Sequence, residues 1–411
     1  MKMQNHSKKI LVISPVPSHP QNQGNRIRIY NMLSYLKKLG CHITFVYFMQ
    51  PLVDAIPDKR YIEEMKRCWD KFYTISLDRG QPAFKDRKIV KFAEAFIQKR
   101  FPWLYYRLKA AFFKKSNFIP LERIPDRALD SFLIKLLKKE RFDAVLVEYI
   151  FISKVLNYFD NKTLKIIDTH DVFTDKHKEI LKSLGSYGWI SATPKEEAEA
   201  LNRADVIIAI QDKEREFFSK ITDKKVVTVG HLISGKIYSP NTILGKKRML
   251  FVGSENDPNQ HGIKYFINEI LPKINKKFSD SSLLLAGRIC NVIDDKNVIK
   301  FGELKDIDLA YDLADVVISP IYIGTGLKIK NIEALSYSKP LITTSFCAKE
   351  LGKEARKCIL IADKPEEWVK AVEKIFLSKK FAEKMSRNAY EFMKKYNDKN
   401  LKTLKEAFNI S

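Results

Sequence analysis

The sequence predicts an α/β protein in which helices cover parallel β-sheets. The opening supports this, because an apolar run at residues 9–14 and a loop at 15–25 precede an amphipathic helical pattern at 27–39. A second apolar run at 41–47 completes a strand–helix–strand unit, which implies a parallel pair of strands. The same alternation recurs along the chain and starts afresh at residue 249.

The remaining strands are predicted from short runs rich in Val, Ile and Leu. In the first half of the chain these runs are residues 144–147, 164–168, 206–210 and 226–229. In the second half they are residues 249–253, 282–286, 298–301, 316–319 and 341–344. A helical pattern at 381–410 has no strand after it.

A polar segment with Gly, Ser and Pro at residues 236–247 separates the two series, and we interpret it as a linker. The predicted organisation is a first domain at 1–235, a second at 248–380 and terminal helices at 381–411. A chain of 411 residues is long enough for two cores.

Composition excludes several classes of protein. Hydrophobic residues make up 45% of the chain, and no run approaches the ~18 apolar residues of a membrane span. The polar start at residues 1–9 lacks the apolar core of a signal peptide, so we expect a cytoplasmic protein. The five cysteines form no CxxC pair and are expected to be free thiols.

The formal charge of +24 has three explanations. These are an anionic partner, a membrane surface, or a proteome rich in lysine. Charge alone does not distinguish them.

The segment 316–344 is the most informative, because it reads as strand, glycine loop, helix and strand. A glycine loop at Gly324–Gly326 that opens a helix presents unpaired N–H groups to an anion, and Lys328 and Lys330 add positive charge. Glu333 follows on the helix, where a carboxylate accepts hydrogen bonds from sugar or ribose hydroxyls. On the loop alone, an ordinary turn with lysines facing water remains an equal alternative.

An ordered set of motifs accompanies this loop. In chain order they are Phe251–Ser254, Pro258–Asn259, Gly262, Leu285–Gly287, Phe301–Gly302, Asp312–Asp315, Gly324–Lys330 and Glu333–Leu335. With these residues the chain resembles the group-1 family of retaining, nucleotide-sugar glycosyltransferases of the GT-B fold. The resemblance implies two Rossmann-like doubly wound domains facing a cleft, with a C-terminal helix that crosses back to the N-terminal domain.

The resemblance also implies the residues that bind the donor. Glu333 matches the family glutamate that holds the ribose hydroxyls, and the loop amides at 324–327 match those that meet the diphosphate. The donor-binding residues expected in this chain are Gly24, Asn25, Ser254, Asn259, Arg288, Gly324, Thr325, Gly326, Leu327, Lys330 and Glu333.

Two departures from the family pattern stand out. Thr325 occupies the place of a glutamate that usually contacts the donor sugar, which leaves the sugar's identity open. The Arg and Lys that many members carry after the first C-terminal strand are absent from residues 254–262. We therefore expect Lys328, with Lys330 or Arg288, to neutralise the phosphates.

A strand at 164–168 delivers His170 and Asp171 to its carboxyl end. The family keeps a histidine here, near the donor sugar, so we expect His170, Asp171 and Lys328 to take part in catalysis. The alternative is a loop histidine whose hydrogen bonds an aspartate satisfies. His19 is a second candidate, although an ordinary loop position explains it as well. In retaining members the leaving phosphate oxygen is thought to accept the acceptor's proton, which removes the need for a separate base.

We expect a metal-independent enzyme without a cofactor, whose donor is a nucleotide sugar such as a UDP- or GDP-hexose. The histidines lack metal-ligand spacing. The Asp306-Ile-Asp308 sequence resembles a DxD metal motif, but its place before a helical run favours capping.

Residues 84–115 interleave basic and aromatic side chains. Such a pattern suits an anionic membrane surface, which would place the protein on the inner face of the membrane and make its acceptor lipid-linked. A solvated helix over an aromatic core is the equal alternative. No nucleic-acid-binding motif accompanies the segment.

The predicted function is transfer of a hexose to a sugar or lipid-linked acceptor, in the synthesis of a cell-surface polysaccharide or glycolipid. The alternatives are a non-catalytic GT-B subunit that binds a partner transferase, and a sugar-nucleotide epimerase. A dinucleotide oxidoreductase is disfavoured, because the first loop carries Gly24 alone and no GxGxxG. The sequence does not determine the oligomeric state.

Overall fold

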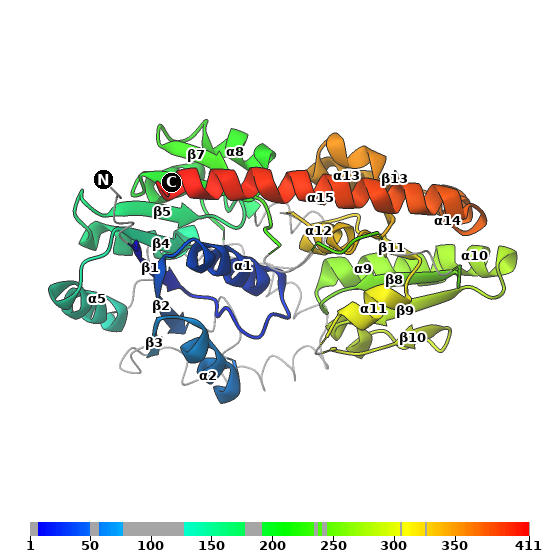
Figure 1. Ribbon diagram of the computed structural model, residues 1–411, viewed down its shortest axis with the longest axis horizontal. Coiled ribbons are helices and arrows are strands. Elements are labelled where there is room, and N and C mark those ends of the chain that lie inside the picture. Colours follow the sequence, from blue (N-terminus) through cyan, green and yellow to red (C-terminus); the bar gives the residue numbers. More distant parts are fainter. Residues whose placement is uncertain are drawn as a thin grey trace, which may run out of the picture. The chain divides into compact units, whose positions relative to one another are not determined.

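A computed structural model describes most of the chain (Figure 1). The described residues are 7–49, 57–76, 127–176, 191–233, 237–240, 245–304, 306–324 and 327–410. The basic and aromatic segment 84–115, and the loop residues Thr325 and Gly326, lie outside them.

The chain divides into two compact units, and each is described by itself. The first comprises Met1–Pro17, Gly40–Ile208 and Phe217–Val226, and the second Ser18–Leu39, Ala209–Glu216 and Val227–Ser411. The domain limits that we give from the sequence remain predictions.

The first sheet has seven strands in the order β3-β2-β1-β4-β5-β6-β7. They are β1 (Lys9–Ser14), β2 (His42–Met49), β3 (Lys71–Ser76), β4 (Ala144–Glu148), β5 (Leu164–Asp168), β6 (Val206–Ala209) and β7 (Lys225–Thr228). The helices along this half of the chain are α1 (Gly24–Lys38), α2 (Lys59–Cys68), α5 (Arg127–Lys139), η2 (Ile150–Tyr158), α7 (Pro194–Leu201) and α8 (Asp212–Phe218).

The second sheet has six strands in the order β10-β9-β8-β11-β12-β13. They are β8 (Arg248–Val252), β9 (Ser282–Ala286), β10 (Val298–Lys300), β11 (Val316–Ser319), β12 (Leu341–Thr343) and β13 (Ile359–Ile361). Its helices are α9 (Asp257–Tyr265), η3 (Phe266–Ile270), α10 (Leu271–Lys277), η4 (Arg288–Asn291), α11 (Asp308–Leu313), α12 (Ile329–Ser336), α13 (Ser345–Leu351), η5 (Glu354–Lys357), α14 (Pro365–Leu377) and α15 (Lys379–Ala407).

Both sheets are doubly wound, which confirms the predicted fold class. Every strand pair with an assigned register is parallel. In each sheet the strand order reverses direction next to the first strand, between β1 and β4 and between β8 and β11. Loops on either side of such a switch point diverge and leave room for a ligand at the carboxyl ends of the strands.

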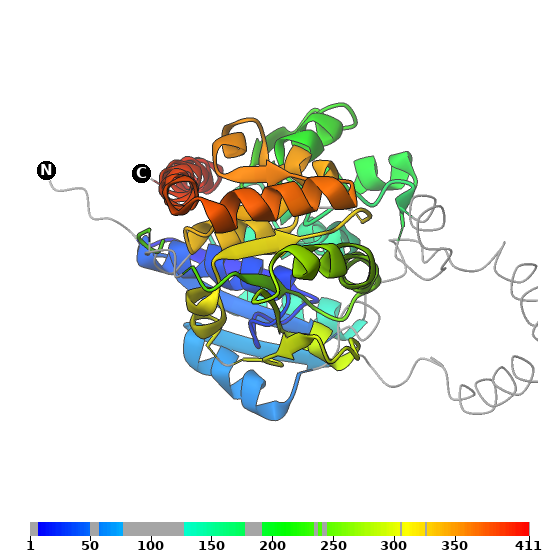
Figure 2. The same cartoon turned by 90° about the vertical axis from the view of Figure 1, so that its right-hand side faces the viewer.

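The C-terminal helix α15 packs beside α12 and α14 (Figures 1 and 2). Two of its asparagines bind the segment that follows β7. The Asn400 side-chain oxygen accepts from Gly230 N at 2.6 Å, and that of Asn397 accepts from Ile233 N at 3.0 Å. Asn397 also donates to the hydroxyl of Tyr35 on α1 at 2.7 Å. Side-chain amides thus hold the terminal helix to α1 and to residues 230–233.

Three elements differ from the sequence prediction. The strands β3 and β13, at the edges of their sheets, were not predicted. Most residues of β3 are at least partly exposed, and β13 has only three residues. Helix α1 begins at Gly24 and not at residue 27, because its first turn is polar. The polar residue Arg28 nevertheless faces inward, is only 2% exposed, and donates to the carbonyls of Val229 and Gly230.

Gly262 on α9 lets the helix approach the backbone after β11. A Cβ atom there would lie 2.0 Å from the carbonyl oxygen of Pro320. We expect Gly262→Ala to destabilise the protein by about 2 kcal/mol, because backbone must move to relieve the overlap. A thermal melt measures this, with His261→Ala on the same helix as the control. Equal melting temperatures for the two variants would contradict the expectation.

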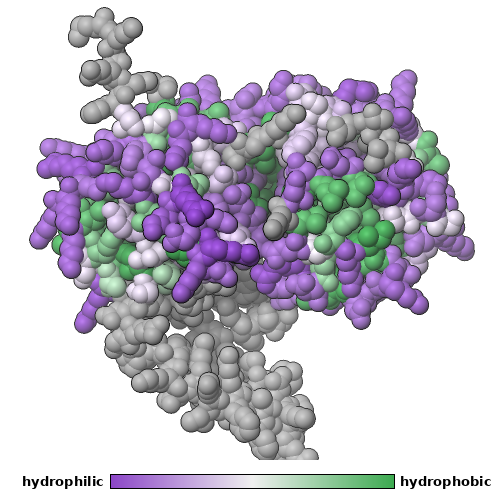
Figure 3. Space-filling model, turned by 60° about the horizontal axis from the view of Figure 1, so that its bottom comes forward, coloured by the Kyte–Doolittle hydropathy of each residue, from purple (hydrophilic) through white to green (hydrophobic). Residues whose placement is uncertain are grey.

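Among the residues that the structure describes, no helix combines the length and apolar composition needed to cross a bilayer. The face in Figure 3 is mostly hydrophilic, with a hydrophobic area at the right of the view. Ile299 on β10 and Leu309 on α11 are among the exposed apolar side chains, at 49% and 53%.

Candidate functional site

The candidate donor site lies at the switch point of the second sheet. Strands β8 and β11 are neighbours there, and the loops at their carboxyl ends carry residues 253–256 and 320–328. After β9, Gly287 has a φ of 89°, and a Cβ on it would lie 2.5 Å from the carbonyl oxygen of Gly253. Only glycine permits this close approach of the β8 and β9 loops.

A chain of hydrogen bonds joins three of the predicted donor-binding residues. The side-chain nitrogen of Asn259 donates to the carbonyl and hydroxyl oxygens of Ser254, at 2.9 and 3.1 Å. The side-chain oxygen of Asn259 accepts from Nζ of Lys330. That Nζ also lies 4.6 Å from the centroid of the Phe251 ring. Asn259 therefore connects its near neighbour Ser254 with Lys330, which lies 71 residues further along the chain.

The three cations expected to neutralise phosphates differ in their surroundings. Lys328 is bound twice by Glu350, through Nζ at 3.0 Å and through its backbone N–H at 3.1 Å. Arg288 is paired with Glu255. Lys330 has an uncharged hydrogen-bond partner, Asn259. An incoming anion can therefore approach Lys330 without displacing a carboxylate that is hydrogen-bonded to Nζ.

Lys330 and Glu333 are one helical turn apart on α12, and both side chains are half-buried. Burial lowers the pKa of Lys330 to about 7. Burial raises the pKa of Glu333 to about 7, and the neighbouring Tyr311 hydroxyl and Lys330 charge oppose this rise only in part. Near neutral pH a bound ligand can therefore select the charge state of both groups.

Three stacked tyrosines lie behind Glu333. The ring of Tyr337 is parallel to those of Tyr311 and Tyr238, with centroids 4.0 and 4.4 Å apart. Both oxygens of Asp308 accept hydroxyl groups, from Tyr337 at 2.5 Å and from Tyr238. The sequence analysis did not single out this stack, because its members are distributed over three elements.

The DxD-like aspartates serve local structure. Asp306 accepts a hydrogen bond from the backbone N–H of Asp308 at 2.9 Å, as expected where a helix begins. Both oxygens of Asp308 accept tyrosine hydroxyls, so this carboxylate takes part in local hydrogen bonds.

Of the other predicted donor-binding residues, Gly24, Gly324 and Leu327 lie near the start of α12. Gly24 is beside Ile329, since a Cβ on Gly24 would lie 3.0 Å from the Cδ1 atom of Ile329. Asn25 accepts from the backbone N–H of Arg26 at 2.9 Å. Gly324 has a φ of 117°, and Leu327 packs against a hydrophobic cluster that includes Ile332 and Leu335. Thr325 and Gly326 are outside the described residues.

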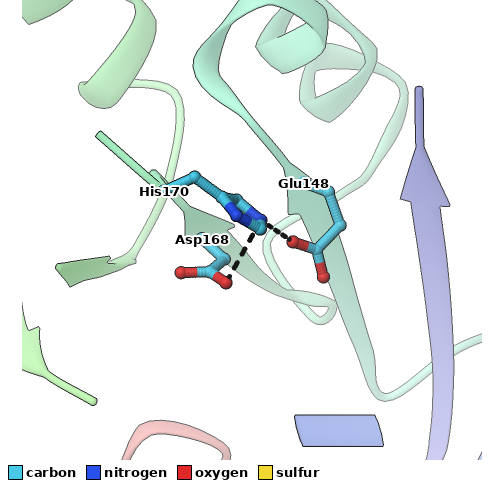
Figure 4. Close-up of side chains that lie close together, drawn as sticks. All are labelled: Glu148, Asp168 and His170. Carbon is cyan, nitrogen blue, oxygen red and sulfur yellow. Dashed lines mark hydrogen bonds and ion pairs between the residues drawn. The ribbon is translucent and has the colours of Figure 1, made fainter. Parts of the chain in front are cut away.

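A second cluster forms in the first unit, where β4 and β5 end side by side (Figure 4). Glu148 pairs in register with Asp168, and both side chains are fully buried. Nε2 of His170 lies 2.6 Å from Oε2 of Glu148 and 3.4 Å from Oδ2 of Asp168. Figure 4 shows the imidazole between the two carboxylates.

The backbone around His170 is constrained. His170 and Tyr149 have φ values of 61° and 70°, in the left-handed region that costs such residues about 1–3 kcal/mol. The neighbouring Thr169 is fixed through its N–H and hydroxyl, which both donate to the carbonyl of Ile208 at 3.0 Å. The Tyr149 ring lies parallel to the imidazole, with centroids 4.1 Å apart. One face and one nitrogen of the imidazole are therefore fixed by the fold.

Asp171, which the sequence analysis places beside His170, has other partners. Its carboxylate binds Lys176 and accepts from the backbone N–H of Val172 at 2.9 Å. The partner of His170 is instead Glu148, which the sequence analysis missed. The available signal was a carboxylate directly after the buried run 144–147, next to the strand that carries Asp168.

The ligand atoms of Glu148, Asp168 and His170 all lie within 4.8 Å of one another, so a metal ion must be considered. Two atoms bound to one tetrahedral Zn²⁺ at 2.0–2.1 Å are about 3.3 Å apart. The 2.6 Å between Nε2 and Oε2 is shorter than this and suits a charge-assisted hydrogen bond. As described, the cluster is a hydrogen-bonded group.

Known proteins resemble this chain in sequence and in fold. Residues 246–377 match the family model described as Glycosyl transferases group 1. An "Uncharacterized 44.6 kDa protein in cps region" of Klebsiella pneumoniae is 22% identical over 370 residues, which are 86% of this chain and 87% of that protein.

Solved structures resemble the whole chain. TarM has a TM-score of 0.66 at 13% identity, over 98% of this chain and 99% of its own. The pneumococcal O-GlcNAc transferase GtfA has a TM-score of 0.64 at 11% identity, over 98% and 99%. HepE from Anabaena has a TM-score of 0.60 at 10% identity, over 97% and 100%.

At such identities these structures establish the fold, and the family model covers the stretch that contains Lys330 and Glu333. The resemblance to group-1 glycosyltransferases is thus confirmed for this domain and for the GT-B fold. Residues 246–377 are a glycosyl transferases group 1 domain, within a chain that has the GT-B fold of glycosyltransferases.

Proposed function

We propose that the protein transfers a hexose from a nucleoside diphosphate sugar to a hydroxyl of a sugar or lipid-linked acceptor. The observation that carries the proposal is the pair Lys330 and Glu333 on the first turns of α12, at the switch point of the second sheet. A cation beside a helix N-terminus suits a diphosphate, and a carboxylate one turn further suits the ribose hydroxyls.

The proposed chemistry is retaining, metal-independent and without a cofactor. The helix N-terminus and Lys330, aided by Lys328, stabilise the leaving diphosphate as negative charge develops. A phosphate oxygen accepts the acceptor's proton on the same face of the sugar. His170 positions a hydroxyl of the donor sugar, and Asp171 fixes its loop through Lys176.

The ligands in the similar solved structures support a nucleoside diphosphate sugar as the donor. GtfA was solved with UDP and GlcNAc, HepE with UDP and glucose, and a TarM variant from S. aureus with alpha-GlcNAc-glycerol and UDP. UDP sugars are therefore the first donors to test. The proposed place in cell-surface polysaccharide or glycolipid synthesis is supported by the relative in the cps region.

A thermal-shift screen against UDP, GDP, ADP, CMP and their sugar conjugates tests the donor site. Ligand at 100 times its dissociation constant should stabilise the protein by about 2.7 kcal/mol. We expect a shift with UDP and UDP sugars, followed by transfer from the best donor to a sugar acceptor. The absence of a shift with every nucleotide would contradict the proposal.

A non-catalytic subunit that binds a partner transferase is the second candidate. The Thr325 substitution and the pairing of Lys328 and Arg288 with carboxylates favour it. Slow hydrolysis of the donor without acceptor would exclude this candidate. Release of an epimerised sugar nucleotide would instead identify an epimerase.

A further inference from the structure

Glu148 is a buried acid that the proposed transfer does not yet use. It ends β4, directly beside Asp168 at the end of β5, and its side chain is 0% exposed. A carboxylate is taken out of water at a large cost unless hydrogen bonds replace its hydration. Its short contact with Nε2 of His170, at 2.6 Å, is one such bond.

The contact with an ionised Glu148 would determine which nitrogen of His170 carries the proton. An ionised carboxylate only accepts hydrogen bonds, so the imidazole must donate through Nε2–H. In a neutral imidazole, the other nitrogen, Nδ1, then has a free electron pair and accepts. The parallel Tyr149 ring, 4.1 Å away, holds the plane of the imidazole, and the contact with Glu148 sets its orientation within that plane.

We propose that Glu148 is the positioning residue of His170. It holds the imidazole as the Nε2–H tautomer and presents Nδ1 as an acceptor for a hydroxyl of the transferred sugar. The catalytic consequence rests on the proposed transfer reaction, whereas the tautomer rests on an ionised Glu148 and on its contact with Nε2.

Asp168 provides a matched comparison for Glu148. Both are buried carboxylates at the ends of adjacent strands, but the Asp168 oxygen lies 3.4 Å from Nε2, beyond a strong hydrogen bond. Glu148→Gln keeps the size of the side chain but can offer either an oxygen or an NH₂ group to the imidazole. Asp168→Asn makes the same chemical change at the longer distance.

Nitrogen-15 NMR of histidine-labelled protein tests the proposal, at a pH where the ring is neutral. The signal of His170 is assigned by its loss in His170→Gln. We expect the Nε2–H tautomer in the wild type and in Asp168→Asn, and a mixture of tautomers in Glu148→Gln. A wild-type Nδ1–H tautomer, or an unchanged tautomer in Glu148→Gln, would overturn the proposal. The wild-type measurement stands even where a variant fails to fold.

Kinetics with the best donor give a second readout. We expect Glu148→Gln to lower kcat about tenfold while KM for the donor changes less than twofold, because a positioning group acts on the reacting sugar. A change in KM alone would overturn this role. Failure of transfer with every donor would contradict the proposed function and leave the tautomer measurement decisive for Glu148.

Calorimetric titration with Zn²⁺ and Mn²⁺, after treatment with a chelator, separates a hydrogen-bonded cluster from a metal site. We expect no binding at micromolar concentrations. Submicromolar binding that is lost in both His170→Gln and Glu148→Gln would overturn the proposal, because the same three side chains would then be metal ligands.

Discussion

Glu333→Gln should weaken binding of the donor by about 100-fold. A carboxylate that accepts two ribose hydroxyls makes two charge-assisted hydrogen bonds, each contributing about 1.5–3 kcal/mol. An amide has one acceptor oxygen, and its NH₂ group faces hydroxyls that no longer find a partner. A loss of about 2.7 kcal/mol corresponds to a 100-fold change in dissociation constant.

Calorimetry with the UDP sugar that gives the largest thermal shift measures this loss. The variant should not melt earlier than the wild type without ligand, because burial already raises the pKa of Glu333 to about 7 and the amide removes that cost. Glu354→Gln, an exposed glutamate of the same unit, is the control. Unchanged donor affinity in Glu333→Gln would remove Glu333 from the donor site.

The fold was largely predictable because it depends on periodicity. Buried parallel strands leave continuous apolar runs, and these identified β1, β8 and β9 directly. Strand β3 was not predicted, since only Ile75 of its residues is buried at the edge of the sheet. Polar residues that face inward, such as Arg28 on α1, also carry no periodic signal.

The candidate site was predictable only where its residues are consecutive or match a motif. Lys330 and Glu333 share one helix, so their spacing alone placed them on one face. The contact of Lys330 with Asn259 on α9, and the pairing of Lys328 with Glu350 on α13, join segments that follow different strands. Glu148 and His170 meet because β4 and β5 are neighbours in the sheet, with Glu148 opposite Asp168. The sequence predicts each strand, but it does not specify which strands pair or in which register.

The pH dependence of donor binding should be bell-shaped, with its maximum near pH 7. Binding needs Lys330 protonated, to attract the diphosphate, and Glu333 ionised, to accept hydroxyls. The pKa of Lys330, lowered to about 7, makes affinity fall as pH rises above 7. The pKa of Glu333, raised to about 7, makes affinity fall as pH drops below 7.

Each limb of this profile should be removed by one substitution. Lys330→Met should weaken binding by about 100-fold at pH 6.5, where the wild-type lysine is charged, and by much less at pH 9. Its profile should therefore be flat on the alkaline side, and that of Glu333→Gln flat on the acid side. A UDP sugar is the right ligand, because its diphosphate does not titrate in this range.

Lys264→Met removes an exposed positive charge on α9 and is the control. Its affinity for the donor should still fall on both the acid and the alkaline side of pH 7. This result would separate a local effect of Lys330 from an effect of the protein's net charge. An alkaline limb that persists in Lys330→Met would assign the titration to another group. A wild-type affinity that does not change from pH 6 to pH 9 would mean that neither pKa lies near 7 in solution. Donor binding would then not change the charge state of Lys330 or Glu333. The diphosphate of the donor would be held by the helix N-terminus and by charges that do not titrate in this range.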